Sequence, residues 1–223
     1  MPLSMAPVAA SFARLWPRAE LCHLLDDALP RDLERAGRLT PPIRRRFLAL
    51  SRYAADAGAD GILFTCSAFG PAIEACREAL PIPVLKPNEA MIDRALALGG
   101  RIALVATFAP TLGSVAGELR ARAREQGVAL ELRTVLARGA LPALERGDLD
   151  RHDALVARAA RSVEGADAVC LAQFSMARAA RPTARLVEAP VLTTPDSAVE
   201  RLRSLVTGRR HAPAAARGRA ARG

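Results

Sequence analysis

The residues best suited to chemistry stand in two related stretches of the sequence. GADGILFTCSAFG (Gly58–Gly70) aligns without a gap on GADAVCLAQFSMA (Gly165–Ala177), at a constant offset of 107 residues. This alignment places the thiol of Cys66 opposite the side-chain amide of Gln173. A thiol can transfer a proton, whereas an amide only donates and accepts hydrogen bonds. The repeat therefore predicts two matching half-sites, only one of which carries a proton-transferring group.

The first half-site is expected to bind an anion beside the thiol. Cys66 stands at the carboxyl end of a predicted strand, the edge where open parallel sheets bind ligands, and Ser67, Ala68 and a helix starting near Pro71 follow it. Backbone amides and the helix dipole at such a place favour an anion. A thiolate next to a bound carboxylate can take the proton from the carbon α to it. The alternative is that Cys66 is a small buried hydrophobe.

Further polar residues follow other predicted strands. Thr107 ends its strand and Thr111 begins the next helix, so each is expected to bind a carboxylate or to cap the helix. Lys86, the only lysine in the chain, is expected to bind an anion, to pair with Glu89, or to lie on the surface. Ser175 stands at the second repeat's strand end, beside the position of Gln173.

The remaining cysteines and the histidines are expected to have no catalytic role. Cys22, Cys76 and Cys170 form no CxxC pair or zinc-ligand spacing, and no nucleotide-binding or metalloprotease motif is present. We therefore expect neither a metal nor a cofactor. His152 is predicted to lie on an exposed helix, and no histidine is placed as a general base.

Short apolar runs that are typical of buried strands alternate with stretches of helical periodicity. The predicted strands are Leu21–Leu25, Gly61–Thr65, Val84–Leu85, Ile102–Ala106, Leu130–Leu136, Val169–Ala172 and Val191–Thr193. The predicted helices are Pro42–Ala57, Asn88–Leu98, Thr111–Gln126, Asp150–Val163 and Asp196–Val206. This order predicts an α/β fold in which parallel sheets are flanked by helices.

The repeat divides the chain into two pseudosymmetric lobes, residues 1–99 and 100–207, with the active site in the cleft between them. Gly58 and Gly165 are expected to adopt a left-handed conformation after a helix. The strand Arg101–Thr107 has its counterpart before Met1, so we expect the first lobe to lack its first strand, through a misassigned start or a truncation. Ser4, which aligns with Thr111, is expected in the loop after that strand.

The composition is typical of a globular cytoplasmic protein. The 223 residues are 51% hydrophobic and 25% charged, and the sequence shows neither a secretory signal nor a long apolar segment. Five of the arginines behind the net charge of +9 lie in residues 208–223, which are predicted to form a disordered tail. Aromatic residues are not interleaved in this tail, so we expect no specific nucleic-acid partner. We also expect no membrane partner.

At these residues the sequence resembles the aspartate/glutamate racemase superfamily, which includes glutamate, aspartate and hydantoin racemases, maleate isomerase and arylmalonate decarboxylase. The resemblance covers most of residues 1–207 and rests on ILFTCSAFGP, RIALVATFAPT and AVCLAQFSMA. It implies two pseudosymmetric α/β lobes with the site between them. It also implies isomerase chemistry in amino-acid metabolism by two cysteines on opposite faces of the α-carbon, without a cofactor, and often in a homodimer.

The resemblance implies roles for individual residues. Cys66 matches the family's first catalytic cysteine, Ser67 and Ala68 its carboxylate-binding positions, and Thr107 its central threonine. Ser175 matches a substrate-contacting position, and Gln173 stands where the second cysteine belongs. We therefore expect proton transfer at the carbon α to a carboxylate, with Cys66 as the acid/base. The alternatives are decarboxylation of a substituted malonate or a related C–C lyase reaction, and carboxylate binding without catalysis.

Overall fold

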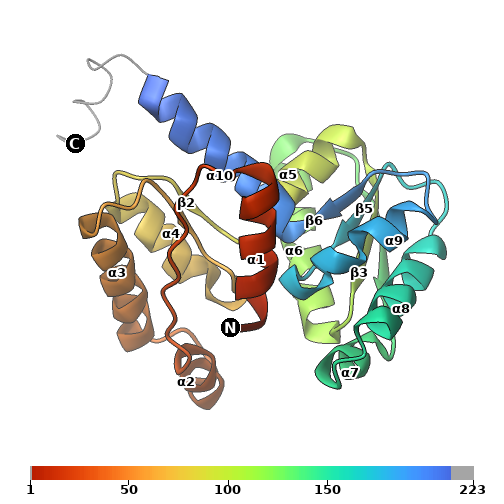
Figure 1. The fold of residues 1–223 in the computed structure, drawn as a ribbon, viewed down its shortest axis with the longest axis horizontal. Coiled ribbons are helices and arrows are strands. Elements are labelled where there is room, and N and C mark those ends of the chain that lie inside the picture. Colours follow the sequence, from red (N-terminus) through yellow and green to blue (C-terminus); the bar gives the residue numbers. More distant parts are fainter. Residues whose placement is uncertain (1, 212–223) are drawn as a thin grey trace.

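Residues 2–211 are described in the computed structural model, and they form two α/β lobes side by side (Figure 1). Each lobe is built on a parallel sheet with helices packed against it. The mixed α/β architecture predicted from the alternation of apolar runs and helical periods is confirmed.

The second lobe contains the larger sheet. Its four strands are parallel and lie in the order β4 (Glu131–Leu136), β3 (Arg101–Ala106), β5 (Ala168–Leu171), β6 (Val191–Thr193). Its helices are α5 (Glu89–Leu98), α6 (Ala109–Gln126), α7 (Ala140–Glu145), α8 (Leu149–Arg161) and α9 (Ala180–Ala184). The predicted boundary after residue 99 assigned α5 to the first lobe, but α5 packs against the second sheet. Apolar side chains cover both faces of β3, as expected of a parallel strand. Leu104 packs with α5 and α6, whereas Val105 packs with α8.

The first lobe is smaller and repeats part of this arrangement. It contains β1 (Ile62–Leu63), β2 (Val84–Leu85), α2 (Leu29–Ala36), α3 (Pro41–Asp56) and α4 (Gly70–Ala79). β1 pairs with β2 in the register in which β5 pairs with β6: Ile62 lies opposite Val84, and Val169 opposite Val191. The offset of 107 residues read from the sequence is therefore present in the backbone pairing.

The predicted strand Leu21–Leu25 is wrong. These residues form no strand and belong to no sheet, and Leu24 and Leu25 remain about half exposed. In the second lobe, β3 lies between β4 and β5 and bonds to both. Within residues 2–211 no strand takes the corresponding place between Leu21–Leu25 and β1, so the segment has no neighbour with which to form a ladder.

Two helices join the lobes. α1 (Pro2–Leu15) packs against α10 (Thr194–His211), and both extend between the lobes (Figure 1). Leu202 and Val206 of α10 share an apolar cluster with Leu85 of β2. α10 also approaches the start of β1 closely, because a Cβ added at Gly61 would come within 2.9 Å of Leu202 Cδ1.

Several boundaries differ from the sequence-based ones. α10 continues through residues 208–211, so the predicted tail is wrong for those four residues, and residues 212–223 lie outside the described residues. Ser4 lies in the first turn of α1, not in a loop, whereas Thr111 lies in the first turn of α6, as predicted. Gly58 and Gly165 both have positive φ, 91° and 70°, as predicted. Only Gly58 directly follows a helix cap, because α8 already ends at Arg161.

Candidate functional site

Cys66 lies just beyond the carboxyl end of β1, as predicted. It caps the 3-10 helix η1 (Ser67–Phe69), which leads directly into α4. Its side chain is partly exposed and packs against the apolar cluster of the first lobe, which includes Phe69. No described residue forms a hydrogen bond or an ion pair with the thiol. The thiol is therefore both accessible and unengaged.

Gln173 occupies the equivalent place in the second lobe. It caps the 3-10 helix η2 (Phe174–Ala179), two residues after β5 ends. Its backbone angles, φ −133° and ψ 144°, resemble those of Cys66, φ −134° and ψ 116°. The two strand ends thus place a thiol and an amide on closely similar backbones.

Unlike the thiol, the amide of Gln173 is held by a neighbour. The backbone N–H of Thr107, at the end of β3, donates to Gln173 Oε1 at 2.7 Å, and the Thr107 hydroxyl donates to the same oxygen at 3.0 Å. Thr107 is buried, with 7% of its surface exposed. The structure therefore brings together two of the predicted site residues through a contact that the sequence analysis did not anticipate.

Lys86 follows β2 and is held by acidic residues of two helices. Its Nζ lies 2.6 Å from Glu74 Oε1, and its backbone N–H donates to Glu89 Oε1 at 3.0 Å. Both oxygens of the Glu89 carboxylate also accept from Arg77 Nη2, at 2.6 and 2.7 Å. The predicted pairing of Lys86 with Glu89 is therefore not an ion pair between their side chains. The Lys86 ammonium pairs with Glu74, and the Glu89 carboxylate pairs with Arg77.

The chain passes from β2 to the second lobe through a buried asparagine. Asn88 is 2% exposed, and its Nδ2 lies 3.5 Å from Glu118 Oε2 of α6. Burial raises the pKa of Glu118, while the Asn88 hydrogen bond and the charge of Lys86 act in the opposite direction. This carboxyl is a titratable group near the junction of the lobes that the sequence analysis missed, because its surroundings come from α5 and α6 together.

The other predicted site residues lie at the same strand ends. Ser67 and Ala68 form the start of η1, Ser175 lies in η2, and Thr111 lies in the first turn of α6. Ser67, Ser175 and Thr111 are partly exposed, and their hydroxyls form no hydrogen bond with any described residue. Neither threonine caps α6, because that position belongs to Phe108.

Phe108 is a site neighbour that the sequence analysis did not single out. It directly follows Thr107 and keeps 48% of its surface exposed, although it is one of the largest apolar side chains in the protein. An exposed phenyl group therefore follows shortly after the carboxyl end of β3. The sequence signal for it is an aromatic residue directly after the predicted strand end in RIALVATFAPT.

The other thiols and histidines have ordinary structural positions. Cys170 and Cys76 are buried, as expected, and burial raises the pKa of Cys170 to about 12. Cys22 is exposed because its predicted strand does not form. His152, predicted on an exposed helix, is instead fully buried, with Nδ1 2.8 Å from Asp153 Oδ1.

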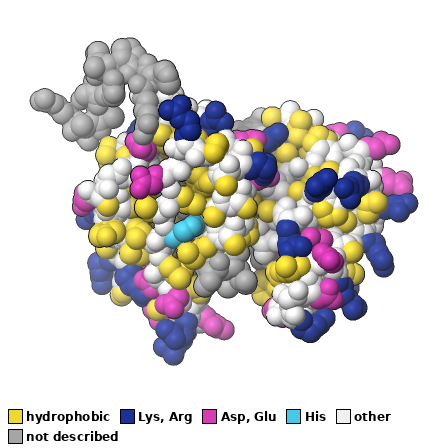
Figure 2. Space-filling model, viewed as in Figure 1, with side chains coloured by type: hydrophobic (Ala, Val, Ile, Leu, Met, Phe, Trp, Pro, Cys, Tyr) yellow, Lys and Arg dark blue, Asp and Glu magenta, His cyan; other side chains and the backbone are white. Residues whose placement is uncertain are grey.

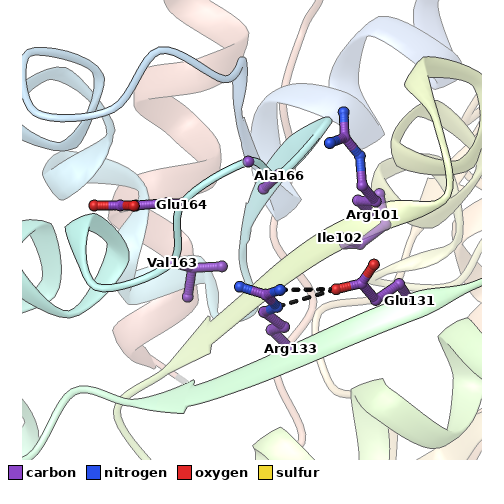
Figure 3. Close-up of a pocket in the computed structure, with 8 residues that line it drawn as sticks. Arg101, Ile102, Glu131, Arg133, Val163, Glu164 and Ala166 are labelled. Carbon is purple, nitrogen blue, oxygen red and sulfur yellow. Dashed lines mark hydrogen bonds and ion pairs between the residues drawn. The ribbon is translucent and has the colours of Figure 1, made fainter.

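A surface pocket of about 160 Å³ lies at the opposite edge of the second sheet, at the amino ends of β3 and β4 (Figure 3). Three of its four charged side chains are already paired: Arg133 Nη2 lies 2.9 Å from Glu131 Oε1, and Arg101 Nη2 lies 2.5 Å from Asp167 Oδ1. The chemistry-bearing residues all lie at the carboxyl ends. The pocket is therefore not the candidate active site.

The surface and the remaining side chains indicate no other type of site. On the face shown in Figure 2, basic side chains are interspersed with acidic and apolar ones. Within residues 2–211, no group of three or more His, Cys, Asp or Glu side chains is arranged to hold a metal ion. None of the helices formed by these residues combines the length and the apolar character that a membrane crossing requires.

Comparison with known proteins identifies one family. The sequence profile described as Asp/Glu/Hydantoin racemase matches residues 31–202. This match includes the ends of β1, β3 and β5 and therefore Cys66, Thr107 and Gln173. No curated protein matches the chain in sequence.

Solved structures share the fold. Glutamate racemase isoform RacE1 from Bacillus anthracis matches with a TM-score of 0.67 and 16% identity, over 93% of this chain and 79% of that one. Allantoin racemase from Klebsiella pneumoniae matches with a TM-score of 0.62 and 23% identity, over 93% and 83%. Arylmalonate decarboxylase matches with a TM-score of 0.55 and 18% identity, over 74% and 77%. At these identities the similarity is one of fold.

Proposed function

The chain belongs to the Asp/Glu/hydantoin racemase family, and we propose that it catalyses cofactor-independent proton transfer at the carbon α to a carboxylate, with Cys66 as the acid/base. One observation carries the proposal. At two strand ends with the same register and similar backbone angles, Cys66 presents an accessible, unengaged thiol, whereas the amide of Gln173 is bound to Thr107.

The proposed reaction begins with a carboxylate bound at the first strand end. The backbone amides of Ser67 and Ala68 and the free Ser67 hydroxyl are suitable donors for its oxygens. The Cys66 thiolate takes the proton from the α-carbon, and the electron pair of the C–H bond moves into the carboxylate to give an enediolate. Donors aimed at the developing charge stabilise this intermediate. The thiol then returns a proton to the same carbon.

A site with one thiol favours proton exchange on one face of the substrate. Two-base racemisation needs a second acid/base on the opposite face, and Gln173 cannot transfer a proton. We therefore expect Cys66 to exchange the α-proton of one enantiomer faster than it inverts the centre.

A second candidate reaction follows from the same feature. In the decarboxylation of a substituted malonate, the bond between the α-carbon and one carboxylate breaks and CO₂ leaves. The electron pair of that bond moves into the remaining carboxylate and gives the same enediolate. The Cys66 thiol then donates its proton to the α-carbon, and solvent restores the thiol. This reaction needs one proton transfer on one face, which is what a single thiol supplies. The fold shared with arylmalonate decarboxylase makes it a specific alternative.

One experiment tests both reactions and the third reading, in which the protein binds carboxylates without catalysis. The protein is incubated in D₂O with amino acids, hydantoins and substituted malonates, and α-deuteration, chirality and CO₂ release are followed by NMR. Deuteration of one enantiomer supports proton transfer at a single thiol, whereas CO₂ release supports the decarboxylase.

Cys66→Ala and Cys66→Ser are expected to lower the rate about 10²- to 10⁴-fold, the usual contribution of a positioned acid/base. Cys22→Ser, which changes an exposed thiol outside the site, is the matched control and is expected to keep full activity. Full activity in Cys66→Ser would overturn the proposal. Binding without exchange, unaffected by Cys66→Ala, would leave only the carboxylate-binding protein.

A further inference from the structure

The side-chain amide of Gln173 has a defined orientation. A backbone N–H can only donate, so the Gln173 atom 2.7 Å from the Thr107 nitrogen must be the carbonyl oxygen. The Thr107 hydroxyl, which donates to the same oxygen at 3.0 Å, reinforces this assignment. The amide cannot rotate by half a turn without placing its NH₂ group against that N–H donor.

The fixed oxygen determines where the NH₂ group points. The two atoms share one planar carbon, so Nε2 is directed away from Thr107. Within residues 2–211 no residue accepts a hydrogen bond from Nε2, and Gln173 is partly exposed. A pair of N–H donors is therefore held in place at the second strand end and left without an acceptor.

Charge makes a carboxylate the natural acceptor. An amide N–H bonds more strongly to an ionised oxygen than to a neutral one. We propose that Gln173 Nε2 donates a hydrogen bond to the substrate carboxylate and to the enediolate formed from it, and that Thr107 is a positioning residue that holds Gln173. This inference rests on the proposed function, because it requires the carboxylate to lie between Cys66 and Gln173.

The inference changes the role expected of Thr107. Both of its donors are directed at Gln173 Oε1, so Thr107 acts through the glutamine and does not itself bind the carboxylate. The second half-site thus has a donor where a two-thiol enzyme has an acid/base. The same arrangement explains how a site with one thiol retains a polar contact on the opposite face.

The test compares two reagents that alkylate thiols and differ in charge. Iodoacetate carries a carboxylate, and iodoacetamide is its neutral counterpart. In both reactions the thiolate sulfur bonds to the CH₂ carbon and iodide leaves with the electron pair of the C–I bond. The ratio of the two rates at Cys66 therefore reports carboxylate binding next to the thiol. Peptide mass spectrometry resolves each site, and exposed Cys22 in the same molecule provides the reference ratio.

We expect the iodoacetate/iodoacetamide ratio at Cys66 to exceed that at Cys22 by about 10-fold or more, the size of a charge-assisted hydrogen bond. Gln173→Leu removes the donor and is expected to abolish most of this preference. Gln173→Glu also adds a negative charge and should lower the ratio further. Gln173→Asn, which is too short to reach both Thr107 and the carboxylate, gives the same test if the leucine variant does not fold.

Thr107 is tested with a matched pair. Thr107→Val keeps the shape but loses the hydroxyl donor, so the ratio should fall a few-fold, whereas Thr107→Ser keeps the donor and should keep the ratio. Thr134→Val, on the exposed strand β4, is the control for the same chemical change and should have no effect. General damage to the site would change both alkylation rates and leave their ratio unaltered.

The outcomes separate this inference from the proposed function. A preference for iodoacetate at Cys66 that survives Gln173→Leu and Gln173→Glu would overturn the role of Gln173 and leave the carboxylate site intact. A Cys66 ratio equal to that of Cys22 would overturn carboxylate binding at this thiol, and both proposals with it.

Discussion

The ends of β1 and β5 carry the two half-sites on similar backbones, yet the sheets behind them are built very differently. β5 lies between two other strands of a four-stranded sheet, and all four of its residues are buried. Among residues 2–211, β1 has a single neighbouring strand, β2, and both residues of β1 are only partly buried. Gln173 is consequently bonded to the adjacent strand end, where Thr107 lies, whereas Cys66 has no such neighbour and keeps a free thiol.

The difference between the two sheets explains how a fold with two similar halves carries an asymmetric site. A side chain at the end of a strand is constrained by the residues at the end of the neighbouring strand. The second sheet supplies β3 as a neighbour of β5, and its last residues determine the orientation of Gln173. The first sheet leaves the corresponding edge of β1 without a partner strand among residues 2–211. The thiol is therefore available for chemistry, and the amide is available for binding.

The largest expected contrast is between Cys66 and Cys170, the thiols of the two equivalent strand regions. A pKa of about 12 leaves about one Cys170 in 10⁴ as thiolate at pH 8, and its side chain is fully buried. Iodoacetamide at pH 8 should therefore modify Cys66 and Cys22 in the folded protein and leave Cys170 and Cys76 unmodified. All four should react after unfolding. Equal protection of Cys66 and Cys170 would contradict the accessible half-site.

Restoring the symmetry of the two strand ends should change the reaction. Gln173→Cys places a second thiol opposite Cys66, so racemisation of the substrate that Cys66 exchanges should rise about 10²-fold, the lower range for a positioned acid/base. Chirality and α-deuteration in D₂O provide the measurement. Gln173→Ser, which lacks a group of suitable acidity, is the control. Exchange that remains confined to one enantiomer in Gln173→Cys would refute the equivalence of the two positions.

The two sheets should differ in how much they contribute to stability. Leu104 of β3 is fully buried, so Leu104→Ala should lower the free energy of unfolding by about 3 kcal/mol through lost burial and an unfilled cavity. Leu63 of β1 is only partly buried, so Leu63→Ala should lower it by about 1 kcal/mol. Urea denaturation measures both values. Equal losses would mean that β1 is as well packed as β3.

The smallest expected effect concerns the amino-terminal edge of the second sheet. Asp167, the counterpart of Asp60 in the repeat, accepts hydrogen bonds from the Arg101 backbone N–H at 2.9 Å and from its guanidinium at 2.5 Å. These contacts lower the pKa of Asp167. A carboxyl group whose pKa is lower in the folded than in the unfolded protein stabilises the fold at pH values above its unfolded-state pKa, about 3.9. This stabilisation is lost as the pH falls through the folded-state pKa.

Asp167→Asn lacks this contribution at every pH. The variant should therefore lose less stability than the unmodified protein when the pH is lowered below about 4. Thermal unfolding followed across that range measures the effect. Asp56→Asn is the control, because the exposed Asp56 side chain forms no hydrogen bond or ion pair with any described residue. Identical pH profiles for Asp167→Asn and the unmodified protein would show that the Arg101 contacts contribute nothing to folding.

Much of the fold was predictable because its signals are local. Six of the seven predicted strands form within a few residues of their expected bounds, and the register of β1 and β2 repeats in β5 and β6. The failed strand, Leu21–Leu25, has a suitable apolar pattern, but a strand also needs a neighbour. That requirement depends on which other strands the sheet contains. The burial of His152 was missed for a similar reason, because the elements packed against its helix include η2 and α9, which come later in the chain.

In the candidate site, the positions of the residues were predictable from local signals, whereas their side-chain partners were not. The positions of Cys66, Ser67 and Gln173 at strand ends follow from apolar runs and a repeat that can be read residue by residue. The partners of Lys86 and Gln173 do not. Glu74 reaches Lys86 from α4, and Thr107 reaches Gln173 from a strand 66 residues earlier in the chain.

Two related halves, with a thiol in one where an amide stands in the other, can be read from the amino-acid sequence alone, because an internal repeat preserves local order along the chain. The hydrogen bonds from Thr107 to the amide, and the lack of such a bond at the thiol among the described residues, could be seen only in the folded structure. Hydrogen bonds and burial at a strand end depend on the neighbouring strand, and the sheet brings that neighbour from a distant part of the chain.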